Sequence, residues 1–152
     1  MRNGTLAGSL LRYQKRFAGL IAGARGRYHA DPLFAQFGML KVSDLYRQQL
    51  RVHAWRFARR MLPENQAAML RRAADIHGYA TRSARSGLAL TSRDHRLVGY
   101  RVPREWASVG KTLRGVGSIG AFKRGSRAGF LSEYAAFRCG VAECFVCRVD
   151  ES

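Results

Sequence analysis

Acidic residues are scarce in this sequence. Only ten Asp and Glu stand against 27 Lys and Arg, which gives the 152-residue chain a formal net charge of +17 at pH 7. So large an excess of one sign cannot be neutralised within the chain, and it indicates a polyanion as partner, RNA or DNA above all. The acids are also dispersed, and the adjacent pair, Asp150 and Glu151, lies next to the last residue of the sequence. Paired carboxylates for catalytic magnesium are therefore not expected, and no catalytic residue is predicted.

Lysine is scarce as well, because 23 of the 27 basic residues are Arg and four are Lys. The planar guanidinium group binds two phosphate oxygens at once and stacks on bases, whereas the lysine ammonium acts as a point charge. Codon bias in a GC-rich source would explain the ratio of Arg to Lys equally well. It would not explain the scarcity of acids, so the net charge is the stronger indication.

Cysteine is limited to a cluster at Cys139, Cys144 and Cys147. An odd number of thiols does not form a disulfide framework, and it favours a reducing compartment. The C-x4-C-x2-C spacing is that with which plant-type iron–sulfur proteins begin, but no fourth cysteine follows. Two interpretations stay open, a zinc site completed by a distant histidine and a small apolar segment with free thiols. The four histidines show no metal-ligand spacing, and we predict neither a metal nor a cofactor.

Long apolar runs are also missing. No stretch of about 18 apolar residues occurs, so we expect no membrane-spanning helix and no membrane partner. The segment before Asp31 contains basic residues but no acid, a composition that mitochondrial transit peptides share. We predict an intracellular protein of the cytoplasm or nucleus, with the mitochondrion as the alternative.

Apolar residues recur at helical spacing in three long segments, residues 10–24, 43–62 and 118–138. In the second, Ser43 is expected to cap the helix, Asp44 to lie at its positive end and Pro63 to end it. A short helix and a turn are predicted within residues 32–42, and a second short helix at residues 64–75. Between residues 88 and 110, short apolar pieces alternate with turn residues, which predicts extended segments and one helical turn after Pro103.

The predicted fold class is therefore mainly α, a short helical bundle with an irregular, partly extended, loop-rich C-terminal half. We divide the sequence into a helical region, residues 1–74, and a basic C-terminal region, residues 75–152. No internal repeat or low-complexity tract interrupts either region.

Several motifs follow one another in a set order between residues 10 and 134. They are LLRYQKRF with HADPLF (residues 10–34), LKVSDLYRQQ (40–49), LPE (62–64), HGYATRS (77–83), VGYRVPREW (98–106) and FKRGSRAGFLSEY (122–134). Together they resemble the region downstream of the catalytic core in reverse transcriptases of non-LTR retrotransposons, of the LINE and jockey type. HGYATRS is similar to that family's His-Asn-Tyr-Asn-Thr-Arg-Ser, and VGYRVPREW to its Tyr-x-Gly-Pro-x-x-Trp box. The resemblance begins inside the basic N-terminal segment, which argues against a transit peptide.

The resemblance implies an RNA-directed DNA polymerase lineage, of which the chain holds the thumb-side helices and the C-terminal region. In that family the paired aspartates of the palm lie upstream, so the chain is expected to be inactive alone, and the upstream polymerase core is a further partner. The chain departs from the family pattern at Gly78, Ala80, Val102 and Ala107, which replace two asparagines, a glycine and an asparagine. These departures indicate a diverged or decaying copy.

We predict a retrotransposon-derived fragment without the catalytic palm that binds RNA or DNA through basic helices. One alternative is a stand-alone basic RNA-associated or mitochondrial protein. Another is a protein-binding domain, for which the face of Tyr46, Leu50 and Phe57 should be exposed. His77 and Thr81 are expected to fix their loop. The predicted contacts to nucleic acid are Arg47, Arg51, Arg59, Arg60, Arg71, Arg72, Arg82, Arg85, Lys123, Arg124 and Arg127, with Tyr79 as a stacking residue.

Overall fold

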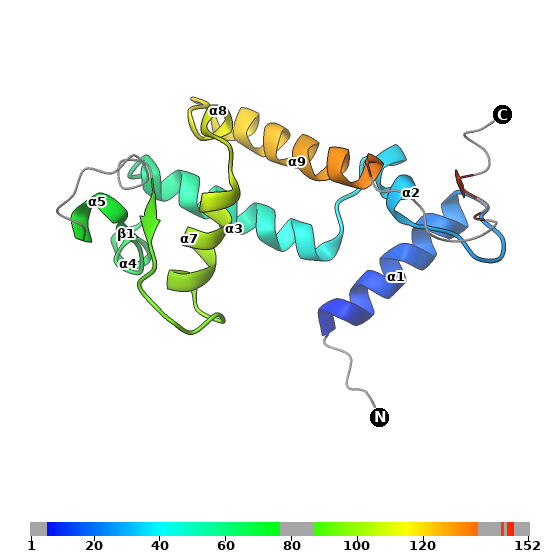
Figure 1. Cartoon of the computed structure of the whole chain (residues 1–152), viewed down its shortest axis with the longest axis horizontal. Helices are drawn as coiled ribbons and strands as arrows, with labels where there is room; N and C mark the ends of the chain where they lie inside the picture. Colours follow the sequence, from blue (N-terminus) through cyan, green and yellow to red (C-terminus); the bar gives the residue numbers. More distant parts are fainter. Residues whose placement is uncertain (1–5, 77–86, 137–143, 145, 148–152) are drawn as a thin grey trace. The chain divides into compact units, whose positions relative to one another are not determined.

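The protein is mainly helical, as the sequence predicts (Figure 1). A computed structural model describes residues 6–76, 87–136, 144, 146 and 147. The chain forms two compact units. Unit 1 takes Met1–Tyr46 and Arg127–Ser152, and unit 2 takes Arg47–Ser126. The units are defined by tertiary packing, in which the end of the last long helix belongs with the beginning of the chain. They differ from the predicted division into residues 1–74 and 75–152.

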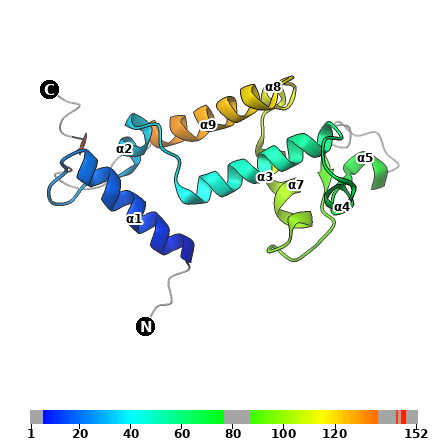
Figure 2. The same ribbon diagram turned by 180° about the vertical axis from the view of Figure 1, so that it is seen from behind.

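Unit 1 contains the helices α1 (Leu6–Ile21) and α2 (Asp31–Gln36), the first turn of α3 (Val42–Ala58) and the end of α9 (Ile119–Ala135). The helices predicted within the periodic segments 10–24 and 118–138 are confirmed by α1 and α9 over the described residues. Both views place α2 beside the carboxyl end of α9 (Figures 1 and 2). The buried residues at this contact form the core of unit 1, which consists of Ala30, Phe34, Leu40, Phe130 and Tyr134.

A polar network crosses this core. The Tyr134 hydroxyl donates a hydrogen bond to the buried Asp44 carboxylate, and it accepts one from the Lys41 backbone N–H at 3.3 Å. Burial, together with the neighbouring Asp44 carboxylate, raises the pKa of Tyr134 well above its ordinary value. The Lys41 ammonium lies 4.3 Å from the centre of the Tyr134 ring and 2.7 Å from Asp31. Asp44 therefore stabilises the packing of α3 on α9, in addition to its favourable place in the first turn of α3.

Helix α1 is fixed to unit 1 through Gln14. Its side-chain amide donates to the Leu40 carbonyl at 3.2 Å and accepts from the Val42 backbone N–H at 2.8 Å. A face of α1 that adjoins Gln14 is apolar but exposed. It carries Leu6, Leu10, Tyr13, Phe17, Leu20 and Ile21, each at least 44% exposed.

Unit 2 is built around the remainder of α3. Its other elements are α4 (Glu64–Ala67), β1 (Arg71–Arg72), α5 (Ala73–Ile76), β2 (Leu88–Ala89), α7 (Val98–Ser108), α8 (Lys111–Arg114) and the start of α9. The strands β1 and β2 pair antiparallel, with Arg71 opposite Ala89 and Arg72 opposite Leu88. The core consists of Val52, Ala54, Trp55, Leu70, Val102, Trp106, Val109 and Phe122.

The predicted helix over residues 64–75 is wrong. It is divided into α4, β1 and α5, because the backbone at Arg71–Arg72 pairs with Leu88–Ala89 instead of continuing a helical ladder. The extended segment expected near residue 88 is confirmed by β2.

Helix α7 is longer than the predicted single turn after Pro103. Pro103 lies inside it, and proline cannot donate the hydrogen bond that the carbonyl of Gly99 would normally accept. That carbonyl instead accepts a hydrogen bond from the Thr91 backbone N–H at 3.0 Å. A long-range partner therefore satisfies the group that the proline leaves open, and the helix continues.

Both predicted ends of α3 also need correction. The helix begins at Val42, with the Asp44 and Leu45 N–H groups bonded to the Lys41 carbonyl, so Ser43 lies inside the first turn. It ends at Ala58, before Pro63, in a turn that has Arg60 in a left-handed conformation. The face expected to be exposed for a protein partner is only partly so, because Leu50 and Phe57 pack against the core of unit 2.

In the described part of the chain, no helix is both long and apolar enough to cross a membrane.

Candidate nucleic-acid interface

The predicted contact residues have very different surroundings. Tyr79, Arg82 and Arg85 lie outside the described residues, as do His77 and Thr81. The other nine fall into two groups. Arg51 is buried, and Arg47, Arg59 and Arg72 are half-buried. The exposed ones are Arg60, Arg71, Lys123, Arg124 and Arg127.

Arg47 and Arg51 are brought together by one carboxylate of α7. Arg47 Nε lies 2.9 Å from Glu105 Oε1, and Arg51 Nε lies 3.2 Å from Glu105 Oε2. Arg51 also donates to the Ser108 hydroxyl at 3.2 Å. The two arginines are four residues apart on α3, so both reach the same side of α7. They stabilise the packing of these helices, which leaves less of their donor capacity for phosphates.

Arg59 contacts a tryptophan, the last residue of α8 and the chain that follows α8. Its guanidinium carbon lies 3.9 Å from the centre of the Trp55 ring. The same group donates to the carbonyl of Arg114 at 3.1 Å and to that of Val116. The cation–π contact and the two hydrogen bonds to backbone carbonyls make Arg59 a structural residue of unit 2.

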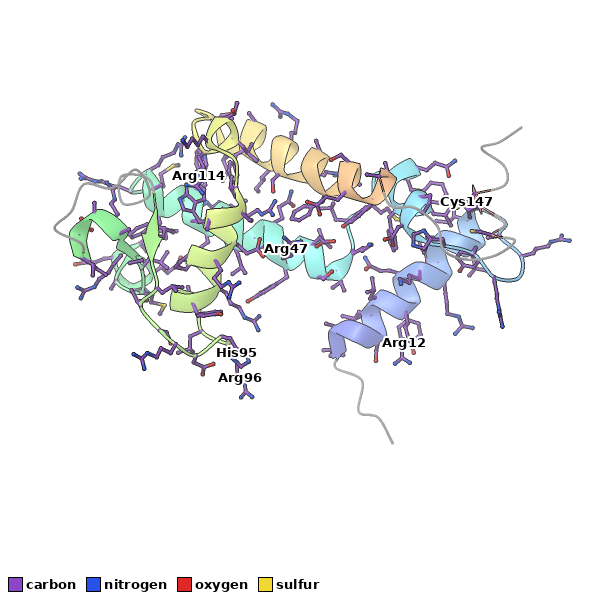
Figure 3. All side chains as sticks on the ribbon, viewed as in Figure 1. Arg12, Arg47, His95, Arg96, Arg114 and Cys147 are labelled. Atoms are coloured by element: carbon purple, nitrogen blue, oxygen red, sulfur yellow. The ribbon has the colours of Figure 1, made fainter. Side chains whose placement is uncertain are left out.

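Arg114, which the sequence did not single out, has a similar role. It lies 5.1 Å from the Trp106 ring centre and donates to the carbonyls of Trp106 and Val109 at 2.7 and 2.8 Å (Figure 3). Burial lowers its pKa. Two further predicted contacts also bond to backbone carbonyls, since Arg72 donates to Ala58 at 3.3 Å and Arg127 donates to Gly38.

The exposed cations far outnumber the exposed acids. Among the described residues the exposed acids are Glu64, Asp75, Asp94 and Glu133, whereas Asp31, Asp44 and Glu105 are engaged internally. The exposed cations of unit 1 are Arg12, Lys15, Arg16, Arg25, Arg27 and Arg127, and those of unit 2 are Arg56, Arg60, Arg71, Arg93, Arg96, Arg104, Lys111, Lys123 and Arg124. Each unit taken alone therefore presents a positive surface.

Several of these exposed cations were not predicted as contacts. Figure 3 shows Arg12 on α1 and Arg96 in the loop before α7, where Arg96 extends away from the ribbon. Arg56 lies on α3 near His53, whose pKa is lowered by burial and by the Arg56 charge. Nothing in local sequence separates these arginines from the structural ones, because the difference depends on acids and carbonyls far along the chain.

Unit 2 also contains a basic pocket with a volume of about 300 Å³. Two arginines, a phenyl ring, two aliphatic side chains and a carboxylate line it. They are Phe57, Arg60, Leu62, Ala67, Arg72 and Asp75. It thus combines cationic donors with an apolar wall.

The cysteine cluster is described only in part, since Cys139 lies outside the described residues. The buried Cys144 sulfur accepts a hydrogen bond from the His29 backbone N–H at 3.1 Å. Burial alone would raise the pKa of this thiol, but backbone N–H groups of Cys147, His29 and Val146 stabilise the thiolate and lower it to about 7. Within the described ranges, no three or more His, Cys, Asp or Glu residues are grouped so that they could hold a metal ion. The zinc interpretation therefore stays a hypothesis.

Comparison with known proteins adds no relative, because no family model, no curated protein and no solved structure matches the chain.

Proposed function

We propose that this chain binds RNA or DNA through electrostatic contacts between its exposed cations and the phosphate backbone. The excess of exposed cations over exposed acids carries this proposal, because it persists after the internal ion pairs have been subtracted. Phosphates offer the dense negative charge that such a surface requires. The proposal assigns the contacts to exposed residues such as Arg71, Lys123 and Arg124, and it assigns Arg47, Arg51 and Arg59 to the fold.

The resemblance to the region downstream of the catalytic core in non-LTR reverse transcriptases supports the same partner. Under this proposal the chain is a retrotransposon-derived piece of an RNA-directed DNA polymerase that lacks the palm and binds nucleic acid without catalysis. A stand-alone basic RNA-associated or mitochondrial protein would share the surface but not the ancestry. An in-frame or frameshifted palm with paired aspartates, encoded directly upstream, would distinguish the two.

Salt dependence tests the electrostatic mechanism. If about six phosphates are neutralised, the logarithm of the duplex association constant should fall against the logarithm of salt concentration with a slope of about −5. Filter binding with a short DNA duplex measures this slope. Salt-independent binding, or no binding at low salt, would overturn the proposal.

A matched pair of variants tests which arginines take part. The double substitution Arg71→Gln with Arg124→Gln removes two exposed cations, and it should flatten the slope by about 2. Arg47→Gln with Arg59→Gln removes the same charge from residues engaged within unit 2 and should change the slope by less than half as much, at a cost in stability. Equal changes in slope for both pairs of substitutions would contradict the assignment of the phosphate contacts to the exposed arginines.

A further inference from the structure

Arg60 occupies an unfavourable backbone position at the end of α3. The Met61 N–H donates to the Arg56 carbonyl at 2.9 Å and the Arg60 N–H donates to Phe57 at 3.0 Å, the two hydrogen bonds of a Schellman turn. Arg60 is the residue in the left-handed position, with φ of 56°. Glycine usually fills this position, because a Cβ atom there costs about 1–2 kcal/mol. The arginine is therefore less favourable for the turn than glycine would be.

Nothing in the described part of the chain offsets this cost through the Arg60 side chain. Neither a hydrogen bond nor an ion pair joins its guanidinium to another described residue. The side chain is exposed and lines the basic pocket of unit 2. Residues with a strained backbone are common at ligand-binding sites, where the strain lowers stability but serves function. The strain at Arg60 therefore indicates a binding role for this residue.

The pocket has a fixed apolar wall. Phe57 and Leu62 are half-buried and pack against the core of unit 2, so their positions are set by that core. Arg72 enters from β1 and is anchored through its hydrogen bond to the Ala58 carbonyl. The volume of about 300 Å³ lies at the lower end of the ~300–1,000 Å³ of small-molecule sites. The pocket therefore suits a ligand no larger than a single nucleotide.

The lining chemistry matches the parts of a nucleotide. Two guanidinium groups against one carboxylate leave a positive balance, which favours an anion such as phosphate. An aromatic ring is a stacking platform for a base, and the Asp75 carboxylate can accept a hydrogen bond from a base N–H or a sugar hydroxyl. Bases in a duplex are already stacked and paired, so only a single strand can offer one.

We propose that this pocket binds one unstacked nucleotide of single-stranded RNA or DNA, with Phe57 against the base and Arg60 on the adjacent phosphate. The inference rests on the proposed function and deepens it, because it adds a single-strand-selective site to a general electrostatic surface.

The substitution Arg60→Gly tests it, measured on the full chain by fluorescence anisotropy with a labelled single-stranded oligonucleotide and with the duplex of the same sequence. Glycine relieves the backbone strain, so the variant should melt at a higher temperature than the wild-type protein. Its affinity for the single strand should nevertheless fall about tenfold, the effect of losing roughly 1.4 kcal/mol of binding free energy. Duplex affinity should fall only about twofold, as expected for the loss of one exposed charge.

Arg124→Ala is the matched control, because it removes another exposed cation of unit 2, one that does not line the pocket. This variant should lower the affinity for the single strand and the affinity for the duplex by the same factor. Phe57→Leu keeps an apolar side chain in the core and removes the ring, and it should abolish the preference for the single strand.

Three results would overturn the inference. In the first, Arg60→Gly and Arg124→Ala change the two affinities alike, which leaves the general proposal standing. In the second, Arg60→Gly lowers the melting temperature, which would mean that the arginine is retained for stability. In the third, Phe57→Leu keeps the preference. Failure of the wild-type chain to bind either nucleic acid at low salt would instead refute the proposed function itself.

Discussion

The two units differ in how many of their basic residues are bonded internally. In unit 2, Arg47, Arg51, Arg59 and Arg114 bond to a carboxylate or to backbone carbonyls, and two of them stack on tryptophans. In unit 1, most cations lie exposed on α1 and in the segment after it, and Lys41 is one that is drawn into the interior. All of these charges contribute to the long-range attraction of a polyanion, but only the exposed ones can contact its phosphates directly.

The hydrophobic cores of the two units also differ in which aromatic and polar side chains stabilise them. Unit 2 packs Trp55, Trp106 and Phe122 together, with ring centres 5.9 and 6.3 Å apart, and its arginines cover the edges of this cluster. Unit 1 relies on Phe34 and Tyr134, and on the hydrogen bond from Tyr134 to Asp44. Both tryptophans of the sequence lie in unit 2, so tryptophan fluorescence reports its unfolding, whereas far-UV circular dichroism reports the helices of both units.

The largest effect is expected from Glu105→Gln. The change leaves Arg47 and Arg51 without their shared carboxylate, and Arg51 is 8% exposed, so its charge loses compensation in a mostly buried place. The free energy of unfolding of unit 2 should fall by about 3 kcal/mol, at the lower end for a broken buried ion pair. Urea unfolding followed by tryptophan fluorescence measures it. Glu133→Gln, at an exposed position, should change it by less than about 0.5 kcal/mol. Equal midpoints for the two variants would show that these arginines are not structural.

The next largest effect is expected from replacing a glycine by alanine, for which each unit offers one position. A Cβ atom on Gly99 would lie 2.2 Å from the Thr91 hydroxyl oxygen, which is itself bonded to the Met69 carbonyl at 3.2 Å. Thr91 is short and held on two sides, so Gly99→Ala should destabilise unit 2 by about 2 kcal/mol. A Cβ atom on Gly19 would meet the far end of Tyr28, 2.1 Å from its hydroxyl oxygen.

Tyr28 can rotate away from an alanine at position 19. It would lose its hydrogen bond to the Lys15 carbonyl, but alanine favours the helix α1, and the two effects of about 1 kcal/mol cancel. Gly19→Ala should therefore be nearly neutral by circular dichroism, and Gly110→Ala, where the space is open, is the control for unit 2. A larger loss at Gly19 than at Gly99 would show that Tyr28, and not Thr91, is the side chain that cannot move.

The periodicity of apolar residues predicted the long helices, which depend on residues close together in the sequence. The apolar spacing within α1, α3 and α9 is enough to identify these helices, since each depends on neighbours three and four residues away. Residues 64–75 and helix α7 were predicted wrongly because distant groups decide them. Arg71–Arg72 pairs with Leu88–Ala89, and Thr91 supplies the hydrogen bond that Pro103 cannot.

The same limit applies to the candidate interface. The sequence identifies the basic residues but not their partners, and Glu105 lies more than 50 residues from the arginines that it binds. The left-handed conformation of Arg60 was equally hidden, because the residue type normally expected there is glycine. The polyanionic partner that charge composition indicates stays a prediction, whereas the choice between structural and exposed arginines needed the tertiary structure.

The smallest effect on stability is expected from replacing the serines at the amino ends of the helices. The sequence favoured Ser43 as a cap, but it lies inside α3. Ser118 instead precedes α9, and its hydroxyl accepts a hydrogen bond from the Ala121 N–H at 3.2 Å, the N3 position that a capping serine bonds. Ser118→Ala should therefore cost about 1 kcal/mol, and Ser43→Ala should cost less than about 0.5 kcal/mol. The Ser118 loss should appear in tryptophan fluorescence, since α9 begins in unit 2 and its Phe122 packs on both tryptophans. If Ser43→Ala proved the more damaging, α3 would have to begin at Ser43 as the sequence suggested, and Lys41 would no longer cap it.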